Sequence, residues 1–128
     1  MKVSKRLLWQ QGAAALFAEI EIDIERSNRT DIEIRCPDAI QPHWSNAIRF
    51  AANLFTESFA WREPMFAQID VSILSIKAVP GDTTVCSLAY VAFHALCSAS
   101  NIDGEQVFAF DRSSGRFSIS LPSLVQTL

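Results

Sequence analysis

One segment of the chain, residues 83–100, is apolar around nearly its whole circumference. Its apolar side chains recur at intervals of three and four residues, as on a helix, and it holds no acid, lysine or arginine. The turn at residues 80–82 precedes it, and Asp82, Thr83 or Thr84 can cap its first free backbone N–H groups. A helix that is apolar on every side must be covered from more than one direction. The pattern therefore predicts a central helix with the rest of the fold packed around it.

A strict alternation of apolar and acidic residues indicates a strand at residues 18–25. Ala18 and three isoleucines point to one side and four acids to the other, which is typical of a sheet with one buried and one solvated face. Residues 30–35 repeat this pattern after a short turn at residues 26–29. Two such strands joined by so short a turn predict an antiparallel hairpin.

Three further segments carry strand signals. Residues 66–77 predict a strand whose apolar phase changes at Leu74, which indicates a bulge or twist near residues 73–75. Residues 107–121 predict a C-terminal hairpin. Residues 2–9 mix basic and apolar side chains, which is typical of a short edge strand or an arm.

A second helix is predicted between about residues 41 and 60. Pro42 suits its first turn, and one apolar stripe recurs at helical spacing while polar residues take the other side. The order strand, strand, helix, strand, helix, hairpin predicts an α+β fold, a two-layer sandwich with two helices on one face of a mostly antiparallel sheet. A chain of 128 residues fits a single domain, 1–128.

Composition and charge narrow the class of protein. Hydrophobic residues make up 49% of the chain, enough for a packed core. The net charge of −3 gives no general attraction to polyanions. Three cysteines cannot pair completely, which suggests a reducing, cytoplasmic compartment. The central helix is near the minimum length of a membrane span, but its hydroxyl residues and its histidine lead us to expect no membrane association.

The solvated face of the predicted sheet is acidic. Seven of the fourteen acids lie between residues 19 and 38, against three arginines, so this face should repel phosphate. Alternate residues on one strand lie about 7 Å apart, too far to share one calcium ion, and we interpret the row as a solvated face. The acids of this face, relieved by Arg35, are Glu19, Glu21, Asp23, Glu25, Glu33 and Asp70.

Two groups of cysteine and histidine residues are candidates for chemistry. Cys86, Tyr90, His94 and Cys97 lie roughly on one stripe of the central helix. Its two cysteines would be about 16 Å apart along the axis, too far for one zinc ion. His94 and Cys97 could share an ion only with ligands from elsewhere, so we interpret the stripe as packing.

The second group is Cys36 with Asp38 and His43. A nucleophilic cysteine needs a base within hydrogen-bond reach and surroundings that lower its pKa, but Pro37 intervenes and no oxyanion-hole loop is evident. The four glycines form no phosphate-binding or dinucleotide motif. We therefore expect no catalytic residue, no metal and no cofactor, while a chemical role for either cysteine–histidine pair stays open.

From Lys5 to about residue 100, the order, lengths and hydrophobic pattern of the elements resemble the fourth domain of elongation factor G and its ribosome-protection relatives. In that family a glycine-rich loop leads into a long acidic strand, as Gln11-Gly12 followed by FAEIEIDIE does here. The strand FAQIDVSIL and the helix SLAYVAFHAL match later elements. The resemblance implies a left-handed βαβ crossover, an exception to the usual rule. The C-terminal hairpin, residues 101–121, and the tail, residues 122–128, lie beyond the part that the resemblance covers.

The family works through a tip made of two loops, which in the factor enters the ribosomal decoding region. The corresponding loops here are Gln10–Ala14 and Lys77–Asp82. They lack the family's long glycine-rich loop and its histidine, and these 128 residues include no GTPase domain. The resemblance therefore supports the fold and does not carry over translocation or ribosome protection. Our first hypothesis is a non-catalytic, stand-alone interaction domain with this tip as its contact surface, and the partner that the resemblance suggests is the ribosome or RNA. The residues assigned to that contact are Lys5, Arg6, Trp9, Gln10, Gln11, Lys77 and Asp82.

Two other functions stay open. A self-associating structural or protein-binding module would form a homodimer through an open strand edge or through the apolar tail residues Leu124, Val125 and Leu128. A small enzyme would need a pocket, for which the space between the helices and residues 61–65 is the candidate, with His43 as the residue to titrate.

Overall fold

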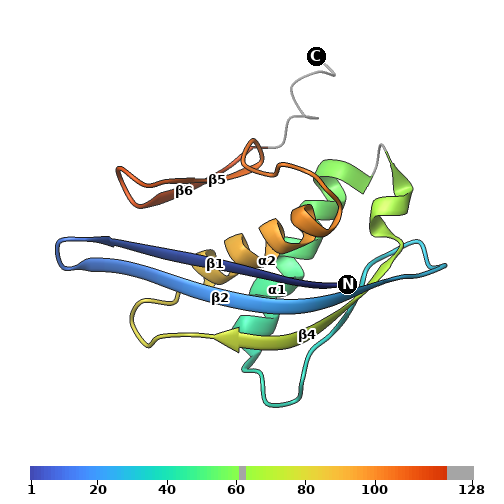
Figure 1. Ribbon diagram of the computed structural model, residues 1–128, viewed down its shortest axis with the longest axis horizontal. Helices are drawn as coiled ribbons and strands as arrows, with labels where there is room; N and C mark the ends of the chain where they lie inside the picture. The colour runs from blue at the N-terminus through green and yellow to red at the C-terminus, as the bar shows by residue number, and fades with distance from the viewer. Residues whose placement is uncertain (61–62, 121–128) are drawn as a thin grey trace.

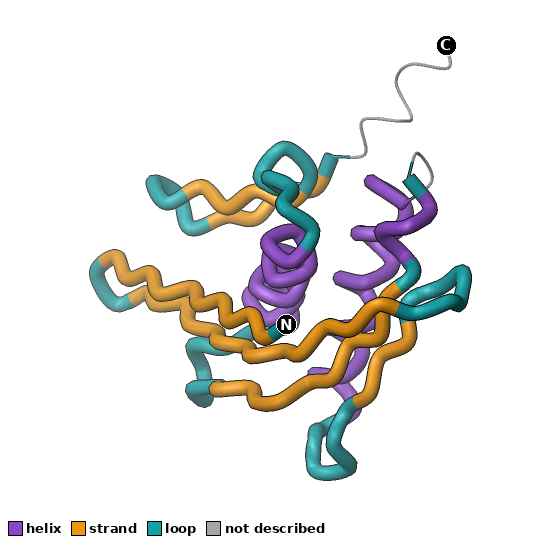
Figure 2. Tube along the Cα trace, turned by 45° about the vertical axis from the view of Figure 1, so that its right-hand side comes forward, coloured by secondary structure: helices purple, strands orange, loops and turns teal. Residues whose placement is uncertain are grey.

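The computed structural model describes residues 1–60 and 63–120. Four strands form the main sheet in the order β1-β2-β4-β3, with both helices packed together on one of its faces (Figures 1 and 2). This confirms the predicted α+β sandwich. The strands are β1 (Lys2–Gln11), β2 (Ala14–Arg26), β3 (Glu33–Arg35) and β4 (Ile69–Lys77). The tail residues Leu124, Val125 and Leu128 lie outside the described residues, as do Trp61 and Leu121.

The predicted hairpin between residues 18–25 and 30–35 is wrong. β2 pairs antiparallel with β1 on one side and with β4 on the other, while β3 pairs in parallel with the far edge of β4. A tight turn at Gly12 (φ 59°) joins β1 to β2. The ten-residue β1 therefore pairs along one side of β2. The nine-residue β4 then covers the remaining side more fully than the three-residue β3 could.

The predicted bulge in β4 is confirmed at Leu74. Glu21 lies opposite Ser75 and Ile22 lies opposite Ile73, so Leu74 is skipped in the register. Its side chain is 41% exposed, whereas Ile73 is buried. The extra residue keeps Ile73 and Ile76 on the same, helix-facing side of the sheet despite their odd spacing.

The amphipathic helix is also confirmed, with a different ending. α1 (Pro42–Phe55) begins with proline in its first turn and passes directly into a π-helical segment, η1 (Thr56–Ala60). A short 3-10 turn, η2 (Pro64–Ala67), occupies the start of what the sequence predicted as strand. Because β3 and β4 are parallel neighbours, α1 lies in a βαβ crossover, whose left hand stays a prediction.

The central helix, α2 (Val85–Ala99), is covered from several sides as predicted. It contacts α1, the first two strands and the C-terminal hairpin, and Phe93 is fully buried. Its N-terminus is closed by a capping box, in which the Thr84 hydroxyl accepts from the Ser87 N–H at 3.0 Å and the Ser87 hydroxyl accepts from the Thr84 N–H at 2.8 Å. Among the described residues, no helix is both long and apolar enough to cross a membrane.

The predicted C-terminal hairpin is formed by β5 (Phe108–Asp111) and β6 (Arg116–Ile119). It lies over α2 as a small second sheet, with the Phe108 and Phe117 rings each 5.5 Å from the Tyr90 ring centroid (Figure 1). Its turn reaches the end of β1, where the Trp9 indole N–H donates to the Arg112 carbonyl at 2.7 Å. Gly115, at φ 71°, packs so closely on this indole that a Cβ atom would overlap with it.

Candidate functional site

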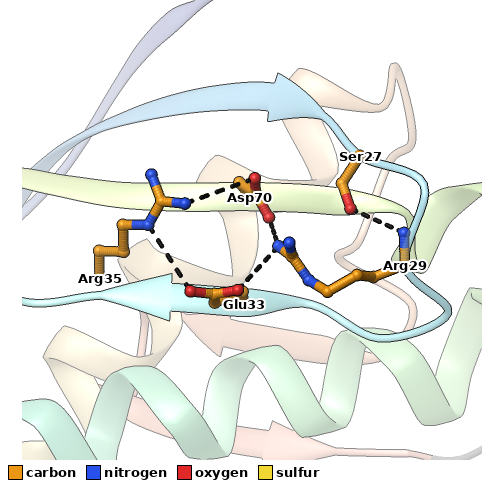
Figure 3. A network of polar contacts seen from close by, with 5 residues as sticks. All are labelled: Ser27, Arg29, Glu33, Arg35 and Asp70. Atoms are coloured by element: carbon orange, nitrogen blue, oxygen red, sulfur yellow. Dashed lines mark hydrogen bonds and ion pairs between the residues drawn. The ribbon is translucent and has the colours of Figure 1, made fainter.

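The acids of the open sheet face are largely matched by cations. At the β3 edge, Asp70 lies between the guanidinium groups of Arg29 and Arg35, and the same two arginines reach Glu33 (Figure 3). The side chain of Asp70 is only 17% exposed, so its charge depends on these partners. The network ties the loop before β3 to β4.

Toward the other edge the matching continues across strands. Glu19 on β2 lies opposite both Arg6 on β1 and Lys77 on β4, with the Lys77 ammonium 3.1 Å from its carboxylate. The Asp23 carboxylate accepts from the amino group of Met1 at 3.0 Å. These cations offset much of the negative charge that the sequence concentrates on this face.

The second loop assigned to the tip, Lys77–Asp82, is bonded to β2 at Phe17, three residues beyond the first loop. The Phe17 N–H donates to the Asp82 carbonyl at 3.0 Å, and the Thr83 hydroxyl donates to the Phe17 carbonyl at 2.7 Å. The register of β4 ends where Lys77 pairs with Glu19, so residues 14–18 of β2 and their partners on β1 project beyond β4. Figure 1 shows this β1–β2 hairpin as the leftmost part of the main sheet.

The structure brings most of the predicted contact residues to this end. Gln10 and Gln11 are exposed beside the Gly12 turn, Arg6 lies over the Phe17 ring at 5.7 Å, and Lys77 is exposed at the end of β4. Trp9 is half-buried against the C-terminal hairpin and does not project from the tip. Asp82 is half-buried, and its backbone forms the loop contact described above.

Lys5 lies elsewhere. It shares the inward face of β1 with Leu7 and Trp9 and lines a hollow of about 320 Å³ between β1, α2 and the loop at residues 102–105. Facing it across this hollow are Tyr90 and His94 from α2, and Asp103 and Glu105 from the loop. None of the loop residues was anticipated from the sequence, because a short irregular loop carries no periodic signal.

Glu105 is the centre of the polar contacts in this hollow. Its carboxylate accepts from the Tyr90 hydroxyl and lies 3.5 Å from His94 Nε2, which also donates to the Phe108 carbonyl at 2.8 Å. The backbone N–H of Glu105 donates to the Asp103 carboxylate at 3.1 Å. Gly104 lets the loop approach α2 this closely, since a Cβ there would lie 2.6 Å from both Cys97 Sγ and the Phe93 ring.

The electrostatics of the hollow favour binding over covalent chemistry. Burial, followed by the hydrogen bond to Glu105, raises the pKa of the Tyr90 hydroxyl, which therefore stays protonated. Burial raises the pKa of the neighbouring Cys97 thiol to about 12, so this sulfur is not a nucleophile near neutral pH. What the described side chains offer here is a set of charged and hydrogen-bonding groups.

The other cysteine and histidine candidates are dispersed. Cys86 is exposed while Cys97 is buried, and no three histidine, cysteine or acidic side chains of the described residues gather closely enough to hold a metal ion. His43 stacks on Trp44 with ring centroids 4.1 Å apart. Burial raises the pKa of the half-buried Cys36 thiol and the nearby Arg49 opposes this, so the thiol is not activated.

The fold has a counterpart among solved structures. The crystal structure of a protein from Thermus thermophilus superposes on 74% of this chain with a TM-score of 0.56 and 11% sequence identity. The chain spans only 14% of that protein's length. At this identity the likeness concerns the fold alone. No family model matches the chain, and no curated protein matches it in sequence.

Proposed function

We propose that the chain is a non-catalytic interaction domain whose contact surface is the tip formed by Gln10–Ala14 and Lys77–Asp82. The observation that carries this proposal is the projection of the β1–β2 hairpin beyond the end of β4, with the second loop hydrogen-bonded to its base. Loops held out by a rigid scaffold are where binding residues concentrate.

The β1–β2 hairpin is held rigidly where it projects beyond β4. Its inward face is fastened by Trp9, which bonds the Arg112 carbonyl, and Arg112 in turn donates to the Leu8 carbonyl at 3.2 Å. A surface already held in place loses little conformational entropy on binding. The outward face near the tip presents Leu8, 55% exposed, beside the half-buried Phe17, so apolar and amide groups are offered together.

The ribosome or its RNA is the partner that the resemblance to the fourth domain of elongation factor G suggests. The tip carries residue types that bind RNA. Arg6 and Lys77 can contact phosphates. Gln10 and Gln11 can hydrogen-bond bases. Glu19 lies between the two cations, so the proposed contact depends on shape and amide groups as well as on charge.

The test is co-sedimentation of the purified protein with bacterial ribosomes across a salt series. A double variant, Arg6→Gln with Lys77→Gln, removes two positive charges without adding an acid beside Glu19. We expect saturable binding that weakens as salt rises and that weakens further in the double variant. The control is Arg49→Gln, which changes an exposed cation on α1, away from the tip.

A second variant pair tests the amide groups. Gln10→Glu with Gln11→Glu keeps the side-chain lengths and should abolish binding to a polyanion by charge repulsion. If wild-type protein fails to sediment with ribosomes even at low salt, or if both tip variants bind as the control does, the proposal is wrong. Lys5 stays unchanged throughout, because it lies outside the tip.

A further inference from the structure

The free edge of β1 is a second surface, which shares Arg6 with the residues assigned to the tip. Met1 both donates to and accepts from Ile24, so in this antiparallel pair the odd-numbered residues of β1 bond to β2. The even-numbered residues then direct their N–H and C=O groups away from the sheet. The Leu8 carbonyl agrees with this, since it accepts from Arg112 on the outer side. β1 has no strand neighbour there within the described residues.

The open part of this edge runs from Lys2 to Arg6. Beyond it the Leu8 carbonyl is occupied by Arg112, and the C-terminal hairpin packs against Trp9. Lys2, Ser4 and Arg6 are left with outward backbone groups, enough for one short strand to pair with. A strand added here would lie about 4.8 Å from β1, with alternate side chains on the α2 side of the sheet.

The hollow between β1, α2 and residues 102–105 lies on that same α2 side, and both cations and acids line it, with Lys5 as its inward-facing cation from β1. Lys5 is half-buried, and its ammonium has no ion-pair or hydrogen-bond partner among the described residues. The acids of the hollow already have internal partners, since Glu105 is held by Tyr90 and His94, and Asp103 accepts from the Glu105 N–H. An unpartnered ammonium on a half-buried side chain favours an anionic ligand.

We propose that an extended acidic segment of a partner protein adds to β1 as a fifth strand along Lys2–Arg6. One of its carboxylate side chains enters the hollow and pairs with Lys5. The backbone hydrogen bonds supply affinity in any sequence, and the hollow supplies the preference for an acid at one position. With a volume of about 320 Å³, it has room for a glutamate side chain with accompanying water.

A second copy of the chain fits this edge poorly. Pairing β1 with its own copy would bring Lys2, Lys5 and Arg6 against the same three residues, and β1 contains no acid to offset them. Basic residues on an edge strand are a known means of preventing self-pairing. An acidic segment therefore fits the β1 edge better than a second copy of β1 does.

The test uses blocked synthetic heptapeptides in which glutamate, glutamine or lysine alternates with valine. Each is titrated into the full-length, isotopically labelled protein and followed by NMR shift changes to millimolar concentration. We expect the glutamate peptide to bind at least tenfold more tightly than the glutamine or lysine peptide, with shifts and slowed amide exchange at Lys2, Ser4 and Arg6. Equal binding of the glutamine peptide would overturn the role of Lys5, and no binding of the glutamate peptide would overturn the proposal.

Two variants separate the backbone from the side chain. Ser4→Pro removes an outward N–H without touching the bonds to β2, a position where an edge strand accepts proline, and Lys5→Gln removes the charge in the hollow. Each should raise the Kd for the glutamate peptide at least tenfold, whereas Arg49→Gln should change it less than twofold. Sedimentation equilibrium without peptide measures whether the wild-type protein forms a dimer. A dimer that is lost in the Ser4→Pro variant would show that a second copy of the chain occupies the β1 edge instead.

Discussion

The two edges of the main sheet differ in length, in charge and in how they are closed. β3 has only three residues, and its loop is fastened to β4 by Arg29, Arg35 and the carboxylate of Asp70. β1 has ten residues and carries three cations and no acid. Among the described residues, its outer side is fastened at one end, by the C-terminal hairpin. A short, ion-paired edge offers little to a partner strand, while a long basic edge discourages its own copy.

This difference suggests a division of roles. The β3 edge contributes to stability, because each of its charged groups is already paired within the chain. The β1 edge keeps backbone groups and the Lys5 ammonium available, at a place where the underlying core is nonetheless well packed through Leu7. Four measurements test this contrast.

Stability should fall most when the buried Leu7 of the β1 edge is truncated. Leu7 is 2% exposed on the inward face of β1, while its neighbour Leu8 is 55% exposed on the outward face. Leu7→Ala should lower the free energy of unfolding by about 2 to 4 kcal/mol. Leu8→Ala, the same change one position on, should stay within about 0.5 kcal/mol. Urea unfolding measures both, and equal losses would show that the two faces of β1 are not distinguished as described.

The next effect concerns the fastening of β1 by the C-terminal hairpin. Gly115→Val forces a β-branched residue into a positive φ and into the Trp9 indole, and should cost about 2 to 3 kcal/mol. Gly12→Val has a similar backbone conformation but open space around its Cβ, so the difference between the two isolates the contact with Trp9. The NMR signal of the Trp9 indole N–H should move in the first variant only.

At the short edge, Asp70→Asn keeps the side-chain shape and removes the charge shared by Arg29 and Arg35. We expect a loss of about 1 to 2 kcal/mol in the free energy of unfolding. Glu25→Gln is the matched control, because Glu25 lies directly opposite Asp70 on β2 and is exposed. Its replacement should be neutral or slightly stabilising, and a loss equal to that of Asp70→Asn would contradict the ion-pair account.

The smallest effect compares the thiols near the two edges. Burial raises the pKa of the Cys97 thiol from 9.0 to about 12, so the unfolded chain ionises first. Its contribution to stability is therefore complete below pH 9 and is lost as the pH rises toward 12. Between about pH 8 and about pH 9.5 this loss is on the order of 1 kcal/mol. Unfolding of the wild type and of Cys97→Ala at both pH values should differ by that amount, with Cys36→Ala as the comparison.

The sequence predicted which face of a strand is buried more reliably than it predicted which strands pair. Alternating isoleucines showed which side of β2 is buried, and the change of phase at Leu74 showed the bulge, because both depend only on local spacing. Pairing depends on segments far apart, so nothing near residues 26–35 indicated that β4 would separate the second and third strands. The orientation of Lys5 could have been inferred from its parity with Leu7 and Trp9. The partners contributed by Asp103 and Glu105 could not, since a close loop approach through Gly104 has no pattern in the chain.

The insertion of β4 between β2 and β3 also bears on how the chain folds during synthesis. The β1–β2 hairpin can form as soon as it leaves the ribosome, because its contacts are local. The other side of β2 must wait, since Glu19 pairs with Lys77 and the intervening chain must be made first. Throughout that interval β2 presents an unpaired edge whose alternate residues are acidic. Like charges on an exposed strand edge disfavour pairing between copies, so we expect the acids to limit association of the unfinished chains.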